Sequence, residues 1–186
     1  MKPFKILSRE VILDNPYCPI EKQHVELPDG STCDWFVNKS SDAVIIIPVL
    51  KTGEILLQKN YKHGSEKVVT EFCAGMIDSG ETPEQAAARE LLEETGHTSE
   101  SLTKLGEVFG NPTGSSMKYH FFLAENCEKS GNQSLDEAEQ IEVFSVKSLD
   151  EARKLLTDSE TQTSAATLAC VTFLRKQVKV APCHAN

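Results

Sequence analysis

The chain has 186 residues, of which 39% are hydrophobic and 25% charged, a composition typical of one globular domain with room for a small annex. Its formal net charge of −9 and sequence pI of about 5.1 argue against nonspecific binding to DNA, RNA or an anionic membrane. An anionic substrate would therefore need a cation to bridge it to the protein. The longest apolar run, residues 43–50, is too short to cross a bilayer and predicts a buried strand.

The cysteines and the N-terminus both favour a cytoplasmic protein. No cysteine forms a Cys-x-x-Cys pair or stands with histidine at zinc-finger spacing, so we expect free thiols in a reducing compartment. Residues 1–16 lack the apolar run and small-residue cleavage site of a secretory signal. The cysteines occupy six positions: Cys18, Cys33, Cys73, Cys127, Cys170 and Cys183.

The first 40 residues predict a three-stranded antiparallel unit. Residues 5–14 and 20–39 are rich in β-forming side chains, and Asp29-Gly30 predicts a tight turn between the second and third strands. We expect residues 1–40 to form this unit and residues 41–186 to form the main domain. A three-stranded unit of this size is rarely stable alone and must bury one face.

The remaining pattern mixes strands and helices, which predicts an α+β fold. Strands are expected on both sides of a turn at Thr52-Gly53, and again where apolar and polar residues alternate further along the chain. These later strands are residues 68–78 (running into a loop), 102–110, 118–126 and 141–146. Residues 111–116 and the polar segment 129–140 read as loops, the second of them mobile.

Three segments predict helices. Residues 82–95 form the first, because Thr82 can cap it, Pro83 suits its first turn and Gly96 can end it. Residues 148–156 begin with a Ser-x-x-Glu capping signal, and residues 164–177 form a mostly buried final helix.

Three glutamates of the first helix, Glu90, Glu93 and Glu94, are expected to project from one face. Like charges at this spacing weaken a helix, so a positive charge is expected beside them. Clustered carboxylates suit a hard, oxygen-seeking cation, Mg²⁺ with Mn²⁺ as a substitute, rather than zinc. The opposite side should pack on a sheet through four apolar residues, Ala87, Leu91, Ala88 and Leu92.

The glutamates belong to a longer pattern, G-x5-E-x7-R-E-L-L-E-E-T-G, which begins at Gly75. It resembles the Nudix box at every fixed position: Gly75, Glu81, Arg89, Glu90, Glu93, Glu94 and Gly96. One position departs, because His97 stands where the family has an aliphatic residue. The resemblance implies the Nudix fold, a mixed β-sheet between helices, and hydrolysis of a diphosphate linkage in a nucleoside diphosphate derivative.

Roles carried over by position follow the motif. The resemblance implies that Glu90 and Glu94 bind divalent metal, with the Ala74 carbonyl as a further ligand. Glu93 would be another ligand, or a carboxylate that interacts with the ligands without contacting the metal itself. Arg89 would orient the glutamates by ion pairing, and Glu81 would support the loop.

Segments outside the box resemble the ADP-ribose pyrophosphatase group. Residues 71–81 are similar to that group's E-L-P-A-G-x-I-D-x-G-E segment, although Phe72-Cys73 replaces Leu-Pro, and Glu71 is a candidate substrate-binding residue. Pro112 stands where the group carries a marker proline. The N-terminal unit and the C-terminal helices also match the group's extra elements.

Several further residues are candidates for the substrate site. Lys59 and Lys62 stand where the group has an R-Q-Y-R-like strand end, and they offer charge for phosphate without the bidentate fork of arginine. Trp35 can stack on a nucleobase or serve in packing. Glu139 matches the loop glutamate that activates water, Glu137 is its alternative, and Glu93 is a third possibility.

The resemblance predicts an Mg²⁺-dependent enzyme that cleaves ADP-ribose or a related nucleoside diphosphate sugar into a nucleoside monophosphate and a sugar phosphate. One alternative is a nucleoside triphosphate or dinucleoside polyphosphate hydrolase. Another is a noncatalytic Nudix module that senses a nucleotide. A homodimer built through residues 1–40 is also expected, without nucleic acid or membrane partners.

Overall fold

The computed structural model describes residues 1–177, which divide into two compact units. The first unit combines residues 1–42 with residues 108–119, and the second combines residues 43–107 with residues 120–177. The sequence placed the boundary near residue 40 and did not predict that a later loop joins the N-terminal strands. Backbone hydrogen bonds make this link within the first unit, including one from Asn38 N–H to the Gly114 carbonyl at 2.8 Å.

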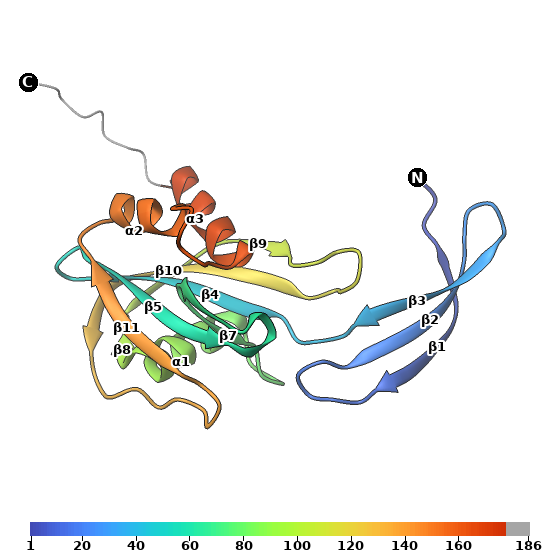
Figure 1. Ribbon diagram of the computed structural model, residues 1–186, viewed down its shortest axis with the longest axis horizontal. Coiled ribbons are helices and arrows are strands. Elements are labelled where there is room, and N and C mark those ends of the chain that lie inside the picture. The colour runs from blue at the N-terminus through green and yellow to red at the C-terminus, as the bar shows by residue number, and fades with distance from the viewer. Residues whose placement is uncertain (178–186) are drawn as a thin grey trace, which may run out of the picture. The chain divides into compact units, whose positions relative to one another are not determined.

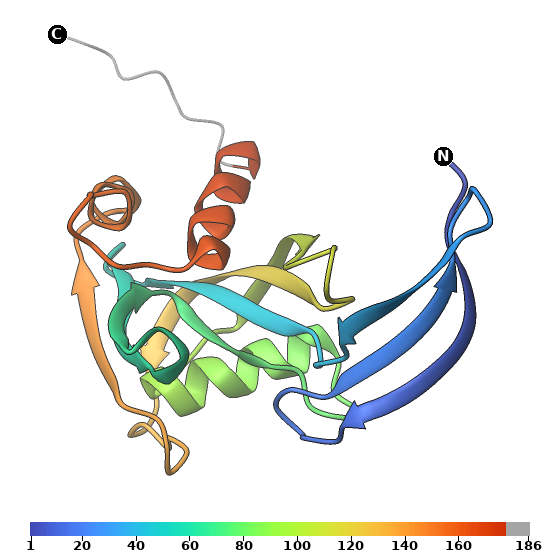
Figure 2. The same cartoon turned by 45° about the vertical axis from the view of Figure 1, so that its right-hand side comes forward.

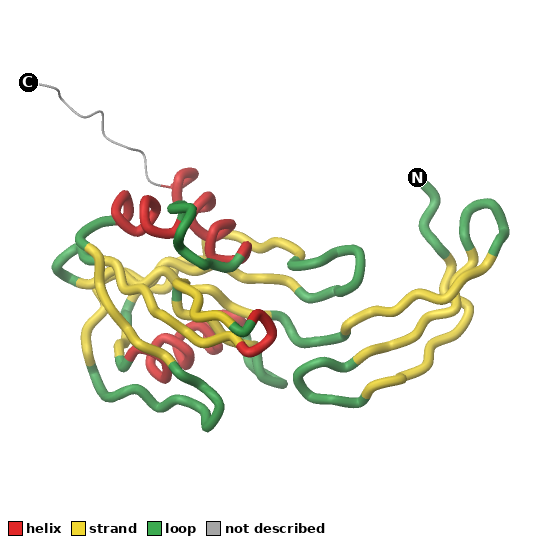
Figure 3. Tube along the Cα trace, in the orientation of Figure 1, coloured by secondary structure: helices red, strands yellow, loops and turns green. Residues whose placement is uncertain are grey.

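The first unit contains the predicted antiparallel sheet (Figures 1 and 3). Its strands are β1 (Lys5–Leu13), β2 (Ile20–Glu26) and β3 (Thr32–Asn38), in the order β1-β2-β3. Gly30 adopts φ +88° in the tight turn before β3, a conformation that glycine accepts without a steric penalty. Every residue of β1 is exposed, so this strand has no cover within its own unit.

The second unit is built on an eight-stranded mixed sheet. Its central path runs β11-β5-β4-β10-β8, with β6 beside β5, β7 beside β4 and β9 beside β10. The predicted strand at residues 68–78 is two short strands, because the β-structure is interrupted at Phe72. The strands are β4 (Ala43–Leu50), β5 (Ile55–Lys62), β6 (Lys67–Glu71), β7 (Cys73–Met76), β8 (His97–Thr98), β9 (Ser101–Phe109), β10 (Lys118–Lys129) and β11 (Ile141–Val146).

Helices cover both faces of this sheet, which confirms the predicted Nudix architecture (Figure 2). Helix α1 (Pro83–Thr95) packs on β4 and β7, α3 (Ala165–Gln177) packs on β4, and α2 (Leu149–Leu156) packs on β11 and β5. A short 3-10 helix, η1 (His63–Ser65), follows β5. Strand β4 is buried over its first six residues because both of its faces are covered.

The packed side of α1 differs from the sequence prediction in part. Ala86, Ala87 and Leu91 are fully buried against side chains of β4 and β10. Leu92 is 39% exposed and Ala88 is also exposed, so these two residues do not pack on the sheet. The buried arc instead extends toward Glu90 and Glu94, which lie beside the apolar stripe rather than opposite it.

Two further observations concern residues 1–177. None of the helices there has both the length and the apolar character needed to span a membrane. The described cysteines are free thiols, as expected, namely Cys18, Cys33, Cys73, Cys127 and Cys170. Cys183 lies outside the described residues.

Candidate active site

Capping interactions fix both ends of α1. The Thr82 side chain accepts a hydrogen bond from Gln85 N–H, and the Gln85 side chain accepts one from Thr82 N–H, which completes a capping box. Gly96 ends the helix with φ +72°. The helix therefore has a fixed length and register, and its glutamates occupy fixed positions over β7.

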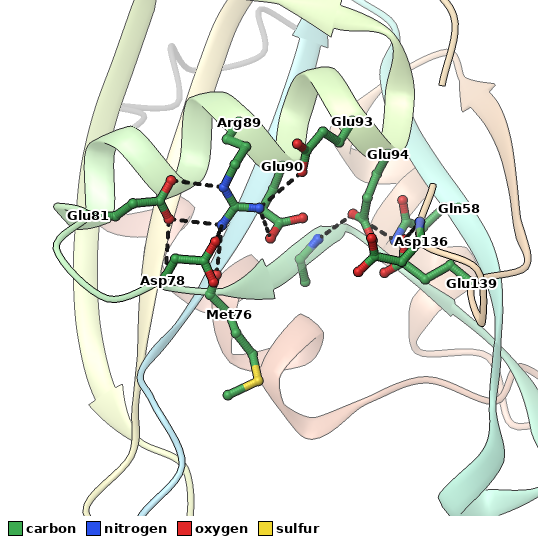
Figure 4. A network of polar contacts seen from close by, with 11 residues as sticks. Gln58, Met76, Asp78, Glu81, Arg89, Glu90, Glu93, Glu94, Asp136 and Glu139 are labelled. Carbon is green, nitrogen blue, oxygen red and sulfur yellow. Dashed lines mark hydrogen bonds and ion pairs between the residues drawn. The ribbon is translucent and has the colours of Figure 1, made fainter. Parts of the chain in front are cut away.

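Arg89 is the centre of an ion-pair network on α1 (Figure 4). Its Nε and one terminal nitrogen donate to the two carboxylate oxygens of Glu81, each at 2.9 Å. The other terminal nitrogen donates to Glu90 at 2.7 Å and to Glu93 at 3.0 Å. Arg89 also donates a hydrogen bond to the Met76 carbonyl at 2.9 Å, which connects the helix to the end of β7. These pairs lower the pKa of Glu81 and raise that of Arg89.

The three motif glutamates differ in burial. Glu94 is 1% exposed and Glu90 8% exposed, whereas the Glu93 side chain is 41% exposed. Burial raises the pKa of Glu90, against the opposing effect of Arg89. Buried carboxylates are costly unless compensated. Glu90 is compensated in part by Arg89, whereas Glu94 has no cationic partner among residues 1–177 and most needs a cation.

Glu94 receives only neutral hydrogen-bond donors in the structure. Ala74 N–H donates to its Oε2 at 2.8 Å, and the Gln58 side chain donates to the same oxygen at 3.2 Å. Its Oε1 is buried and has no hydrogen-bond partner among residues 1–177. Burial therefore raises the pKa of Glu94 to about 7, despite these hydrogen bonds. Gln58 was missed by the sequence analysis, because nothing in a β-strand pattern shows which polar residue will be buried.

Glycine at position 75 allows the close approach of β7 to the helix. A Cβ atom there would overlap the Glu90 carboxylate. A side chain at position 75 would therefore displace the Glu90 carboxylate, and the carbonyl of Ala74 lies next to Gly75 in the same strand.

The loop between β10 and β11 brings Glu139 toward the glutamates. The Glu139 carboxylate acts on Glu90 by charge repulsion, and Figure 4 shows it on the Glu94 side of the network. In the loop it accepts a hydrogen bond from Asp136 N–H at 3.1 Å. Glu137 and Glu139 are both exposed, so burial does not separate them. The position of Glu139 on the Glu94 side of the network makes it the candidate loop carboxylate of the site.

The two candidate lysines of β5 leave opposite faces of the strand, which the sequence analysis did not foresee. Lys62 pairs with the buried Glu71 at 2.9 Å, and Asn60 donates to the same carboxylate at 3.2 Å. Lys59 is exposed, and its ammonium lies 5.9 Å from the centre of the Phe144 ring. Alternation along a strand explains the difference, so the two lysines do not form one cationic pair.

Trp35 and Pro112 lie beside the same cavity of the first unit, although they are far apart in the sequence. Both line a cavity of about 470 Å³. The Trp35 indole N–H donates to the Thr113 carbonyl at 2.9 Å, and its ring meets Phe4 edge to face with 6.0 Å between centroids. The side chain is therefore held in one orientation on that unit.

The carboxylates of the site suit a hard divalent cation. They supply oxygen donors only, and one buried oxygen of Glu94 lacks a partner within the described chain. Over residues 1–177 no three acidic, cysteine or histidine side chains already converge as a ligand cluster. Glu90 and Glu93 are instead ion-paired with Arg89 (Figure 4). The donor chemistry fits Mg²⁺ or Mn²⁺.

Two family models match this chain. The NUDIX domain model matches residues 39–166, and the model of the nucleoside diphosphate sugar hydrolase N-terminal domain matches residues 4–38. The chain therefore belongs to the Nudix family. Together with the carboxylate site, the relatives below show that it is a Nudix pyrophosphohydrolase.

Similar proteins cover most of the chain. ADP-ribose pyrophosphatase of Bacillus subtilis is 34% identical over 157 residues, which is 84% of each chain. The methanol dehydrogenase activator of Bacillus methanolicus is 29% identical over 174 residues, or 93% of each chain. The crystal structure of an ADP compounds hydrolase is 25% identical, has a TM-score of 0.83 and covers 96% of both chains.

Proposed function

We propose that the protein hydrolyses the diphosphate linkage of ADP-ribose or a related nucleoside diphosphate sugar in the presence of Mg²⁺. The products are a nucleoside monophosphate and a sugar phosphate. The observation that carries this proposal is the buried pair Glu90 and Glu94, in which Glu94 has no cationic partner among residues 1–177. The names of the relatives, ADP-ribose pyrophosphatase and ADP-sugar pyrophosphatase, support the choice of substrate class.

The residues of the chain divide the work of the reaction. Glu90, Glu94 and the Ala74 carbonyl hold the divalent cation, with Glu93 behind them. Bound there, Mg²⁺ polarises the phosphoryl group and stabilises the leaving phosphate. Glu139 takes the proton from the attacking water, since its carboxylate lies on the Glu94 side of the network in Figure 4. Arg89 fixes the carboxylates, and Lys62 offers its charge to phosphate from beside Glu71.

Hydrolysis of a panel of substrates tests the proposal. We expect phosphate-ester products from ADP-ribose or a nucleoside diphosphate sugar, such as ADP-glucose or GDP-mannose, with kcat/KM above those for 8-oxo-dGTP and diadenosine polyphosphates. Activity should require Mg²⁺ or Mn²⁺ and vanish in excess chelator. Full activity in chelator would overturn the metal assignment. A clear preference for a triphosphate would favour the alternative hydrolase, and binding without turnover would favour the sensor.

Glu139 has its own test within this proposal. Replacing Glu139 with Gln should lower kcat by about 10² to 10⁴ with little change in KM, because a general base acts in the transition state. Glu137→Gln is the matched control in the same loop and should stay near wild type. If only Glu137→Gln lowers kcat, Glu137 is the base. If neither variant lowers kcat, the base lies outside the loop, with Glu93 as the next candidate.

We also propose that residues 1–40 hold two chains together as a homodimer, beside a hydrolase domain of residues 41–186. Support comes from β1, where every residue is exposed, including a run of large apolar side chains: Ile6, Leu7, Val11, Ile12 and Leu13. Trp35, held against Thr113, would then be available to a nucleobase. Light scattering that gave the mass of one 20.5 kDa chain would rule out the dimer. An active, soluble monomer after deletion of residues 1–38 would remove any role of this unit in the site.

The described cysteines are free thiols, and this supports the further proposal that the protein works in the reducing cytoplasm.

A further inference from the structure

The loop that carries Glu139 is fastened to the last turn of α1. The final carbonyls of a helix have no partner inside the helix and need outside donors. Here residues 130–134 supply them. Ser130 N–H and Gly131 N–H donate to the Gly96 carbonyl at 2.9 and 3.1 Å, and Ser134 N–H donates to the Glu93 carbonyl at 2.8 Å.

Gln133 adds a side-chain bridge across the base of this loop. Its Nε2 donates to the Glu94 carbonyl at 2.7 Å and reaches the Ile141 carbonyl at 3.4 Å. One amide group thus joins the end of α1 to the first residue of β11. Residues 134–140 form a short loop whose two ends are connected through Gln133, and Glu139 lies two residues before Ile141.

We propose that Gln133 is a positioning residue for the hydrolysis, because it sets where Glu139 lies relative to Glu90 and Glu94. The inference rests on the function proposed above. The Glu94 carboxylate belongs to the proposed metal site, where it accepts from Ala74 N–H, and the Glu94 backbone carbonyl accepts from Gln133, so one residue of α1 connects the metal site to the loop. Gln133 itself is exposed and acts through the loop rather than on the substrate.

Removing the amide without removing the side-chain volume tests this role. Gln133→Met loses the donor and keeps the length of the side chain, and we expect kcat to fall by about 10- to 100-fold with KM within about twofold. Gln133→Arg restores donors for carbonyls at a helix C-terminus and should recover most of the loss. Asn132→Ala is the control, because Asn132 is the exposed neighbour and its side chain makes no hydrogen bond to the rest of residues 1–177.

A double-mutant cycle separates positioning from general damage. If Gln133 acts through Glu139, Gln133→Met should cost less than about twofold in kcat once Glu139 is Gln. A loss as large in that background as in the wild type would overturn the proposal. If Glu139→Gln lowers kcat and Gln133→Met does not, this inference alone is overturned. If Glu139→Gln leaves kcat unchanged, both the assignment of Glu139 as the base and this inference are overturned.

Amide hydrogen exchange of the full chain in chelator gives a second measurement that does not depend on turnover. Gln133→Met should raise the exchange rates of residues 134–140 by about tenfold while the amides of α1 and the Tm stay unchanged. Unchanged exchange in the loop would overturn the proposal. So would equal acceleration through α1, because that pattern means loss of overall stability.

Discussion

The two ends of the carboxylate site differ in how their negative charge is compensated. At one end, the single guanidinium of Arg89 serves Glu81, Glu90 and Glu93. At the other end, Glu94 is more deeply buried, and its hydrogen-bond donors within residues 1–177 are all uncharged: the Ala74 N–H, the Gln58 amide and the Cys73 thiol. The pKa of Glu81 is accordingly lowered, whereas that of Glu94 is raised to about 7.

This difference shows why the acidic helix is stable and yet suited to a metal. Arg89 neutralises the exposed side of the cluster, so the helix tolerates its like charges. The buried side is left with an uncompensated carboxylate, which costs folding free energy when it is ionised. A site of this kind loses stability to gain affinity for a cation, and each of the following changes tests one end of it.

The largest effect is expected from the two buried carboxylates that we propose as metal ligands. Glu90→Gln and Glu94→Gln should each lower kcat by about 10³-fold or more, because they remove ligand charge while keeping the side-chain shape. Glu93→Gln should cost only about 10- to 100-fold, as expected of a carboxylate behind the ligands. Steady-state kinetics at saturating Mg²⁺ measures this ranking, and circular dichroism checks the fold. Equal losses in all three variants would contradict the distinction between the two buried carboxylates and the more exposed Glu93.

Arg89→Met should break the compensated end. We expect a loss of about 10²-fold in kcat, since Glu81, Glu90 and Glu93 lose their common partner at once. Arg89→Lys should restore little of it, because one ammonium cannot reproduce the fork that serves Glu81 through two parallel bonds. Unfolding in urea with and without Mg²⁺ adds a second measurement. The cation should stabilise the Met variant more than the wild type, and equal stabilisation would count against the charge argument.

Glu94→Gln should stabilise the metal-free protein at high pH. The folded-state pKa of Glu94, about 7, lies above the ordinary value of 4.5, so the folded state binds the proton more tightly. Protonated Glu94 therefore contributes to the free energy of unfolding fully below pH 4.5. This contribution, up to about 3 kcal/mol, is lost as the pH rises through 7.

Urea unfolding in chelator at pH 5 and pH 8 measures this difference. The free energy of unfolding of the variant should exceed that of wild type at pH 8 by more than at pH 5. Glu90 is present in both proteins and its charge also raises the pKa of Glu94, so the comparison reports the loss of the Glu94 charge together with its repulsion by Glu90. A variant that is less stable than wild type at pH 8 would show that Glu94 is compensated after all.

Gly75→Ala should give the smallest of these effects, about a tenfold loss in kcat. The new methyl group would push the Glu90 carboxylate aside, and a flexible side chain can yield, so the fold should survive. Gly64→Ala is the matched control, because a Cβ at Gly64 meets no atom within 4 Å. Calorimetry should show similar Tm values for both variants. An equal kcat in the two would mean that the position of Glu90 is not set by this contact.

Local features of the sequence determined much of the fold and the identity of the site. Thr82, Pro83 and Gly96 predicted the bounds of α1, because capping and turn preferences act over a few residues. The apolar run of β4 predicted a strand covered on both faces. The fixed spacing of the motif predicted which glutamates share a helix face, since helical periodicity is a property of the chain alone.

Only the tertiary structure decided how unequal those glutamates are and what surrounds them. Burial of Glu94 beside Gln58, the pairing of Lys62 with Glu71, and the bridge from Gln133 to the end of α1 all join segments far apart in sequence. The same holds for the loop 108–119, which joins the N-terminal strands. Periodicity shows which way a side chain points on its own element. Burial and hydrogen-bond partners depend on which other elements pack against it, and packing is settled only when the whole chain folds.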